Sequence, residues 1–454
     1  MQKGLFQYAF ILFCRSRTAL TGVLILLVSG IAGLYLGSTF INRQQAMIRK
    51  AAAMQPETTR RNIQYFGKEL GTLLYHNRYT MADQPGNWAA FSNGQRDINP
   101  YIMSVSMLGL QGQLYDTDLS NPVTLLYGNI DLAFVFIFLF PLVIIAFTYN
   151  LWSAEKESGV WRLLHPHAER PAGILLTKLL VRIVVVFAVA WLLLLIACLY
   201  LPLPADIRLL WVFLAVSSYL LFWFALSFFV TALGRSSDFN VATLIACWVG
   251  LNILAPALVN IIVSWKYPVP EALQTVVQQR EGYHEKWDKD KQVTMTRFYQ
   301  HYPQFRKYSF PQDAAFSWSW YYAMQQMGDD EAASGVAAMA AKLQQRQQFA
   351  NNAALFLPGI QTTLRLNEIA GTDLQHHLDF QAALQQYHEN IRLYFYPFIF
   401  KGSTVKDVDW NQFGITFFRK YSTEKCWQLL SVLLFTILLS CMAWRMLRRK
   451  LTTQ

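Results

Sequence analysis

One loop of the chain, Ser153–Lys178 (SAEKESGVWRLLHPHAERPAGILLTK), places charged and apolar residues at the spacing of a short amphipathic helix. Ser153 is a suitable N-cap residue, and Pro166 is expected to end the helix before Pro171 opens the next one. One face would carry Trp161, Leu163 and Leu164, and the other Glu155, Lys156, Glu157 and Arg162. A partner protein bound to such a helix could displace it, and this displacement would move the flanking segments. An ordinary interfacial helix is an equally good interpretation of the residues alone.

The sequence contains no recognisable set of residues for covalent catalysis. It contains no GxxxxGK(S/T) phosphate loop, no Gly-Gly-Gln signature, and no HExxH, Ser/Lys or paired-carboxylate constellation in its apolar segments. We therefore predict that the chain is not an enzyme and binds no cofactor. His376, His377 and His388 are candidate metal ligands, but adjacent histidines on a helix point to different faces, so no metal site is expected.

The elements that must position this loop are membrane spans. Of 454 residues, 54% are hydrophobic and 15% are charged, and six apolar runs have the length of about 20 residues that a bilayer requires. They are Leu20–Ile41, Ile130–Tyr149, Leu175–Tyr200, Leu209–Leu233, Val241–Ser264 and Trp427–Met446. The net charge of +11 arises from Lys and Arg at the edges of these runs, where lipid headgroups explain them, so no nucleic-acid partner is expected.

Basic residues at both chain ends predict that both termini are cytoplasmic, which an even number of spans satisfies. The predicted fold class is an all-α membrane protein of six transmembrane helices, in the cell inner membrane, with a mainly helical periplasmic domain built from two insertions. The predicted division is 1–41 for the N-terminus and first span, 42–129 for the first insertion, 130–264 for spans two to five with the cytoplasmic loop 151–176, 265–425 for the second insertion, and 426–454 for the sixth span and basic tail.

The two insertions have their own helical patterns. Gln44–Tyr75 should continue the first span outward, with a break near Pro56. Asp329–Phe356 and Asp373–Tyr396 have the composition and spacing of helices. The aromatic residues Trp318, Trp320, Tyr321 and Tyr322 suit a domain core better than contact with a substrate or lipid.

Two prolines and two glycines within the spans could shape motion and packing. Pro141 and Pro256 are candidate helix hinges, although a static packing kink explains them equally well. Gly33 and Gly37 form a GxxxG pair, which favours close helix contact and gives weak support for a dimer.

The run that begins at about Gly128, GNIDLAFVFIFLFPLVIIAFTYNLWSAEKESGVWRLLHPHAERPAGILLTKLL, resembles the second span, coupling loop and third span of ABC-2 type transporter permeases. The family pattern of an acidic pair, a Gly, a Leu pair and a Pro reads here Glu155, Glu157, Gly159, Leu163, Leu164 and Pro166. Val160 stands where the family often has Thr. The stretch Leu355–Phe400 is similar to a subgroup with a large extracytoplasmic insertion, related to gliding-motility-type permeases.

The resemblance implies the membrane-spanning subunit of an ATP-driven exporter. It would pair with an ABC ATPase subunit, which docks on the loop and binds ATP and Mg, and with a second permease subunit, either identical or a related paralogue. The large external insertions keep a different function open. In that alternative, the ATPase drives a mechanical or signalling device that acts on an envelope partner without transport. An intramembrane enzyme ranks last.

Overall fold

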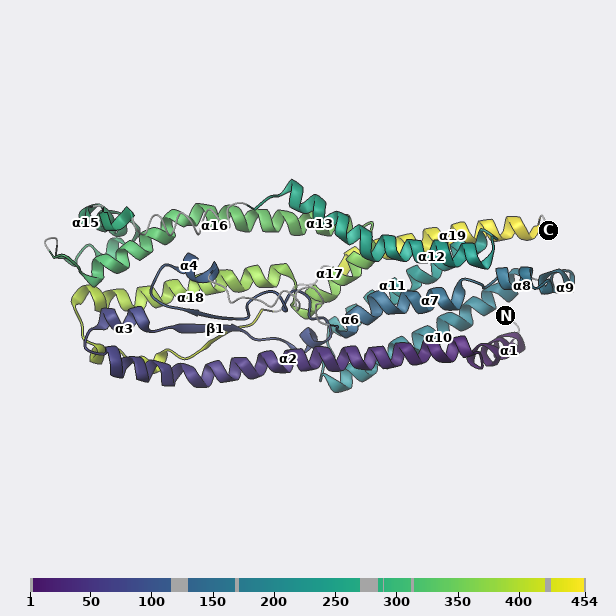
Figure 1. The fold of residues 1–454 in the computed structure, drawn as a ribbon, viewed down its shortest axis with the longest axis horizontal. Coiled ribbons are helices and arrows are strands. Elements are labelled where there is room, and N and C mark those ends of the chain that lie inside the picture. The colour runs from purple at the N-terminus through teal and green to yellow at the C-terminus, as the bar shows by residue number, and fades with distance from the viewer. Residues whose placement is uncertain are drawn as a thin grey trace.

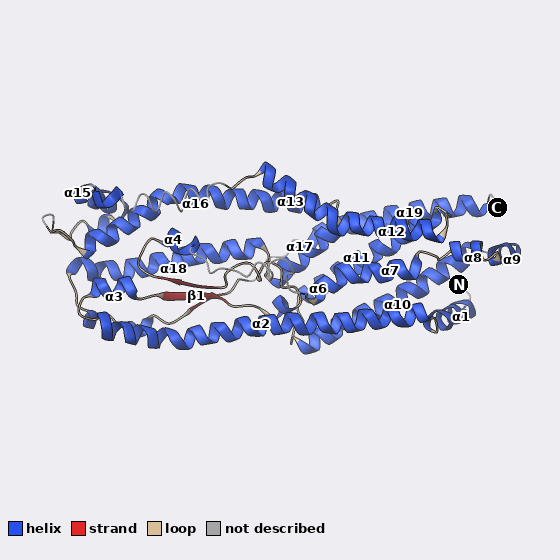
Figure 2. Cartoon of the chain, viewed as in Figure 1, coloured by secondary structure: helices blue, strands red, loops and turns tan. Residues whose placement is uncertain are grey.

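The computed structural model describes residues 3–115, 130–167, 171–269, 285–288, 290–311, 314–420 and 426–452. The molecule is elongated, with a helical bundle at one end and a second, mostly helical part at the other (Figures 1 and 2). Both chain termini lie at the free end of the bundle (Figure 1). We call the second part the extramembrane domain; it comprises the described residues within 42–115 and 267–420.

Six helices among the described residues are long and apolar enough to cross a membrane, and they confirm the six predicted spans. The spans, in order, are Arg17–Phe66, Leu132–Glu157, Pro171–Tyr200, Ile207–Ala232, Ser237–Lys266 and Trp427–Leu451. Their elements are α2 (Arg17–Phe66), α6 (Leu132–Phe134), η2 (Val135–Leu139), α7 (Phe140–Thr148), α8 (Ser153–Glu157), α10 (Pro171–Tyr200), α11 (Ile207–Ala232), α12 (Ser237–Val249), η3 (Gly250–Leu254), α13 (Ala255–Lys266), η7 (Cys426–Leu429) and α19 (Leu430–Thr452). A short helix, α1 (Lys3–Cys14), precedes the first span and packs on α10.

The core of the bundle is built around α11, which packs on α7, α19 and α17 (Pro358–Ala370). Its side chains Tyr219 and Trp223 are almost fully buried. In contrast, only 6% of the most apolar part of the fifth span is buried, compared with 67% for the second span. The fifth span therefore leaves most of its surface for lipid or another protein.

The glycines of the first span pack inside this chain. A Cβ atom at Gly33 would lie 2.7 Å from the carbonyl oxygen of Asp131, and one at Gly37 would overlap the carbonyl oxygen of Ala90. The GxxxG pair thus brings α2 close to α6 and to η1 (Asn87–Ala90), so these glycines give no support for a dimer.

The extramembrane domain surrounds a small three-stranded sheet that the sequence analysis did not anticipate. The central strand β1 (Tyr79–Asp83) pairs antiparallel with β2 (Ile102–Val105) and parallel with β3 (Thr416–Phe418), so both insertions contribute strands. Its helices among the described residues are α3 (Leu70–His76), α4 (Leu110–Tyr115), α15 (Lys291–His301), α16 (Trp318–Ala354), α17, which also packs on α11 of the bundle, and α18 (Leu374–Lys401). Short 3-10 turns are η4 (Pro303–Phe305), η5 (Val405–Asp407) and η6 (Trp410–Gln412).

The predicted helices Asp329–Phe356 and Asp373–Tyr396 correspond to the longer helices α16 and α18. The predicted break of Gln44–Tyr75 near Pro56 is wrong, because the interruption lies at 67–69, between α2 and α3. Helix α2 continues through Pro56 and ends at Phe66. Next to the proline, the Gln55 side chain donates to the carbonyl of Arg78 at 2.5 Å and accepts from the Thr80 hydroxyl at 2.7 Å. These bonds to β1 and the residue before it hold the helix in place, so the backbone bond lost at one proline does not interrupt it.

The aromatic cluster is a domain core, as predicted. Trp320 and Tyr322 are fully buried among the rings of α15, α16 and α18. The Tyr322 hydroxyl donates to the carbonyl of Gly71 at 2.8 Å, which joins α16 to α3.

A buried polar network also joins the two insertions. Asp83 accepts from Arg96 at 2.5 Å and bonds His376 at 3.0 Å. Burial alone would raise the pKa of Asp83, but the hydrogen bond with His376 and the charge of Arg96 outweigh it and hold this pKa below its usual value. His376 is thus part of this network, and Nε2 of His388 lies 2.9 Å and 3.0 Å from the carbonyl oxygens of Ser106 and Leu108. Among the described residues, no group of three potential ligands could hold a metal ion.

Candidate functional site: the loop between the second and third spans

The predicted loop helix is two helices, α8 and α9 (Val160–His167), which meet at Gly159. Gly159 has a φ of 75°, a backbone conformation that side chains other than glycine rarely adopt, and this breaks the helix. The prediction that Pro166 ends the helix is wrong, because Pro166 lies inside α9. A proline removes only one backbone bond, so the helix can continue through it. Both helices lie at the end of the bundle that carries the termini (Figure 1).

Ser153 does not cap this helix, contrary to the prediction. It is the first residue of α8, it is buried, and its Oγ lies 2.7 Å from Oγ of Ser237. The nearby Asn240 side chain donates to the carbonyl of Tyr149 at 2.9 Å. The start of the fifth span therefore packs directly against the beginning of the loop.

Glu157 strengthens the same connection. One of its carboxylate oxygens accepts from the backbone N–H of Ser237 at 2.7 Å, and the other accepts from the Ser237 hydroxyl at 2.9 Å. A carboxylate at this position satisfies an otherwise unpaired N–H and stabilises the positive end of the α12 helix dipole. The sequence analysis missed Ser237, although the Ser-Ser-Asp run at 236–238 is a recognisable helix start.

Glu155 makes the matching connection to the third span. Its carboxylate forms an ion pair with Lys178 of α10. One turn later, Arg182 donates to the carbonyl of Phe147 at 2.5 Å and to the carbonyl of Lys178 at 2.9 Å. The side chains of Lys178 and Arg182 are thus engaged by the protein and do not extend to lipid headgroups.

The predicted apolar face of the loop is divided. Trp161 is buried and packs edge-on against Trp152, with ring centroids 5.8 Å apart. Leu163 is 72% exposed and Val160 is 43% exposed, and Arg162 is also exposed. The side chains of Leu164 and Pro166 lie outside the described part of the structure. One side of α9 is therefore anchored, and the other presents apolar and basic groups outward.

The two candidate hinge prolines occupy equivalent positions. Pro141 is the second residue after the π-helical segment η2, and Pro256 is the second residue after the π-helical segment η3. A π-helical segment together with a proline weakens the regular backbone ladder at that level of a helix. The second and fifth spans thus share the same local irregularity.

Tyr219 of α11 lies between these two irregular segments. Its hydroxyl is 2.9 Å from the carbonyl oxygen of Ile137 and 3.0 Å from Oδ1 of Asn252. Each of these residues lies four positions before a proline, and a regular helix would bond the carbonyl of Ile137 to the N–H that Pro141 lacks. Trp248 also donates to the carbonyl of Phe138 at 3.1 Å. Sequence analysis missed Tyr219 because an isolated tyrosine in an apolar span carries no local signal.

Six apolar spans that carry a large helical domain at one end define a multi-pass membrane protein. Residues 11–319 match the family described as ABC-2 family transporter protein, and the chain belongs to this family. The matched residues include the α8–α9 loop and both prolines, and they confirm the predicted family. Members are typically non-catalytic membrane subunits that generally pair with ABC ATPases.

Residues 272–414 match a second family, a domain of unknown function named DUF3526. This match falls within the second insertion and includes α15, α16, α17 and α18. No curated protein and no solved structure matched the chain.

Proposed function

We propose that this chain is the permease subunit of an ATP-driven ABC-2 exporter, and that a separate ATPase moves it through α8 and α9. One observation carries the proposal. Glu155 and Glu157, two residues apart on α8, bind two different spans, through Lys178 of the third and Ser237 of the fifth. A displacement of the loop would therefore reach both spans at once.

The exposed side of α9 supplies the docking surface. Val160, Arg162 and Leu163 face outward there, whereas Trp161 fixes the helix to the bundle. An apolar side chain beside a basic one suits a protein partner, because burial of Leu163 would stabilise the complex and Arg162 would orient it. ATP and Mg would be bound by that partner, not by this chain.

Basic residues support a cytoplasmic location for this end of the bundle. Arg445, Arg448, Arg449 and Lys450 lie in the last turns of α19, near the loop and the N-terminus (Figure 1). The extramembrane domain would then lie in the periplasm of a cell with an inner membrane. The stretch Leu355–Phe400 further supports a place in the subgroup related to gliding-motility-type permeases.

A second permease subunit, identical or paralogous, would cover the little-buried fifth span, with lipid around the remainder. Within each subunit the paired irregularities at Pro141 and Pro256 would act as hinges. Because Tyr219 bonds the residues four positions before both prolines, the second and fifth spans would bend together.

One observation favours the second candidate function, a mechanical or signalling device. Helix α2 is a continuous element of 50 residues that leads from the bundle to the far part of the extramembrane domain (Figure 1). Motion of the bundle would therefore reach an envelope partner without passage of a substrate.

Copurification tests the proposal. We expect the wild-type chain to retain an ATP-hydrolysing subunit, Leu163→Asp to lose it, and Leu163→Met to retain it. A purified assembly without ATPase activity would overturn the proposal. Transport into proteoliposomes by the intact assembly would support the exporter, and ATPase activity that moves the extramembrane domain without transport would support the mechanical device.

A further inference from the structure

The extramembrane domain contains a groove that neither family match explains. It has a volume of about 400 Å³ and lies between α16 and α18, with α4 at its base. Its lining runs along α16 from Gln326 to Gln344, which at 1.5 Å per residue is about 27 Å. A groove of this length would hold about eight residues of extended chain.

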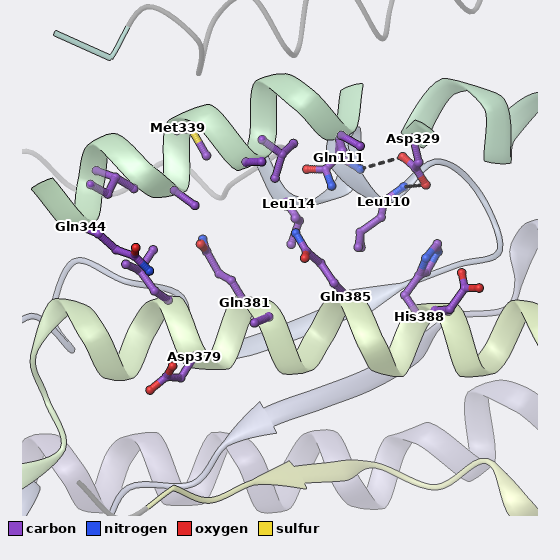
Figure 3. A pocket seen from close by; sticks show the side chains of 18 of the residues that line it. Leu110, Gln111, Leu114, Asp329, Met339, Gln344, Asp379, Gln381, Gln385 and His388 are labelled. Atoms are coloured by element: carbon purple, nitrogen blue, oxygen red, sulfur yellow. Dashed lines mark hydrogen bonds between the residues drawn. The ribbon is translucent and has the colours of Figure 1, made fainter. Parts of the chain in front are cut away.

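The two walls differ in chemistry. The α16 wall is apolar and made largely of small residues, namely Ala333, Val336, Ala337, Met339, Ala340 and Leu343. The opposite wall carries amide side chains, and Figure 3 shows Gln381 and Gln385 directed from α18 toward α16. Each such amide can both donate and accept a hydrogen bond.

Charged residues around the groove are already engaged. Asp329 pairs with Arg392 at 2.8 Å, and Asp379, which points away in Figure 3, pairs with Lys420 at 2.6 Å. Glu389 accepts from the Tyr302 hydroxyl at 2.5 Å. Asp329 and Asp379 are therefore neutralised by basic partners, and the Glu389 carboxylate is held by a hydroxyl donor. Among the described residues, the lining includes no Phe, Tyr or Trp on which a sugar could stack.

A buried hydrogen-bond acceptor at the base of the groove lacks a donor among the described residues. Gln111 of α4 is 94% buried, and its Oε1 has no hydrogen-bond partner among the described residues. Figure 3 places this side chain between α16 and α18. An unpaired buried acceptor is unfavourable, so a donor N–H from a ligand would stabilise the site.

From these features we infer that the groove binds an extended, uncharged segment of a polypeptide. The backbone of such a segment alternates N–H and C=O groups, which match Gln111 on one side and Gln381 and Gln385 on the other. Its small side chains would pack on the alanine-rich wall of α16. This inference goes beyond the proposed function, because it assigns a protein ligand to the extramembrane domain whether or not a substrate crosses the membrane.

Direct binding to the full chain in nanodiscs tests this inference. The probe is a fluorescent pool of acetylated, amidated decapeptides built from Ala, Ser, Thr, Asn, Gln, Val and Leu, compared with a matched pool that contains Asp and Lys. We expect saturable binding of the uncharged pool and weaker binding of the charged pool. Gln111→Leu and Ala337→Trp should each weaken binding about tenfold or more.

Adjacent residues provide matched controls. Gln386 and Ala338 are exposed and do not line the groove, so Gln386→Leu and Ala338→Trp should bind the pool like wild type. Gln111→Leu should leave the unfolding temperature unchanged or higher, because it removes an unpaired acceptor. No saturable binding, or equal binding by all variants, would overturn the inference. So would binding of monomeric octyl glucoside in the groove without peptide binding, which would indicate a small amphipathic ligand.

Discussion

The hydroxyl of Tyr219 lies 2.9 Å from the carbonyl oxygen of Ile137, the carbonyl that Pro141 deprives of its helical donor. The same hydroxyl lies 3.0 Å from the side chain of Asn252, four residues before Pro256. A hydroxyl has one hydrogen, so it can donate to only one of these acceptors at a time. Tyr219 of the fourth span can therefore donate in turn to the irregular segment of the second span and to that of the fifth.

We expect Tyr219→Phe to weaken this level of the bundle. It leaves the carbonyl of Ile137 without its donor, which should cost about 1–3 kcal/mol and lower the unfolding temperature. Turnover by the intact assembly should fall, while ATPase binding should not change. Tyr200→Phe is a suitable control because Tyr200 is half exposed at the end of α10. Wild-type stability and turnover in Tyr219→Phe would contradict the hinge proposal.

Glu157→Ala should uncouple the loop from the fifth span. The carboxylate satisfies the backbone N–H of Ser237 at a helix start, where loss of a cap costs about 1 kcal/mol. We expect little loss of stability, a normal amount of bound ATPase, and transport or domain motion reduced several-fold. Glu157→Gln, which keeps one acceptor, should retain more function than Glu157→Ala. Equal function in all three proteins would exclude a coupling role for this side chain.

Charge reversal tests the connection to the third span. Glu155→Lys places two cations together at a half-buried site and should lower stability by on the order of 2 kcal/mol. The double variant Glu155→Lys/Lys178→Glu restores opposite charges and should recover much of this loss in a thermal unfolding assay. If the double variant is no more stable than Glu155→Lys, the two side chains do not act as a pair.

Gly37→Ala should destabilise the protein without a change in its oligomeric state. The added methyl group would overlap the carbonyl oxygen of Ala90, and such overpacking costs about 1–3 kcal/mol. Gly4→Ala is the matched control, since a Cβ there meets nothing within 4 Å. Light scattering and thermal unfolding separate the two effects. Dissociation of an otherwise stable assembly would show that Gly37 lies at a subunit interface.

The extramembrane domain should lose stability as the pH falls from 6.5 to about 4. Burial lowers the pKa of His377 to about 4, and burial and the charge of Arg392 hold the pKa of His388 well below its usual value. In this range the unfolded chain binds more protons than the folded chain, so the free energy of unfolding rises with pH. The lowered pKa of Asp83 adds a further loss only below about 4.

Hydrogen exchange of this domain in the full chain, measured at several pH values, checks the effect. His377→Gln should reduce the pH dependence between 6.5 and 4, because glutamine does not titrate. The exposed Gln386 does not titrate, so Gln386→Leu is the control and should leave the profile unchanged. A profile that is the same for wild type and His377→Gln would contradict the assignment.

Contacts between residues far apart in the chain could not be predicted from the sequence. The six spans were predictable because each is a continuous apolar run, and the α8–α9 region was predictable from its motif. The contact between Glu157 and Ser237 was not, because 80 residues separate them. Strands β1 and β3 are also far apart in the chain and only five and three residues long, too short for a clear period-two pattern.

The uninterrupted length of α2 has a geometric effect on any motion of the bundle. At 1.5 Å per residue its 50 residues extend about 75 Å, so a tilt of about 5° at the base displaces the tip by about 6 Å. Since Gln55 fastens this helix to the segment around β1, the sheet would travel with it. A small angular change among the spans would thus become a displacement larger than the spacing of two β-strands at the far end of the molecule.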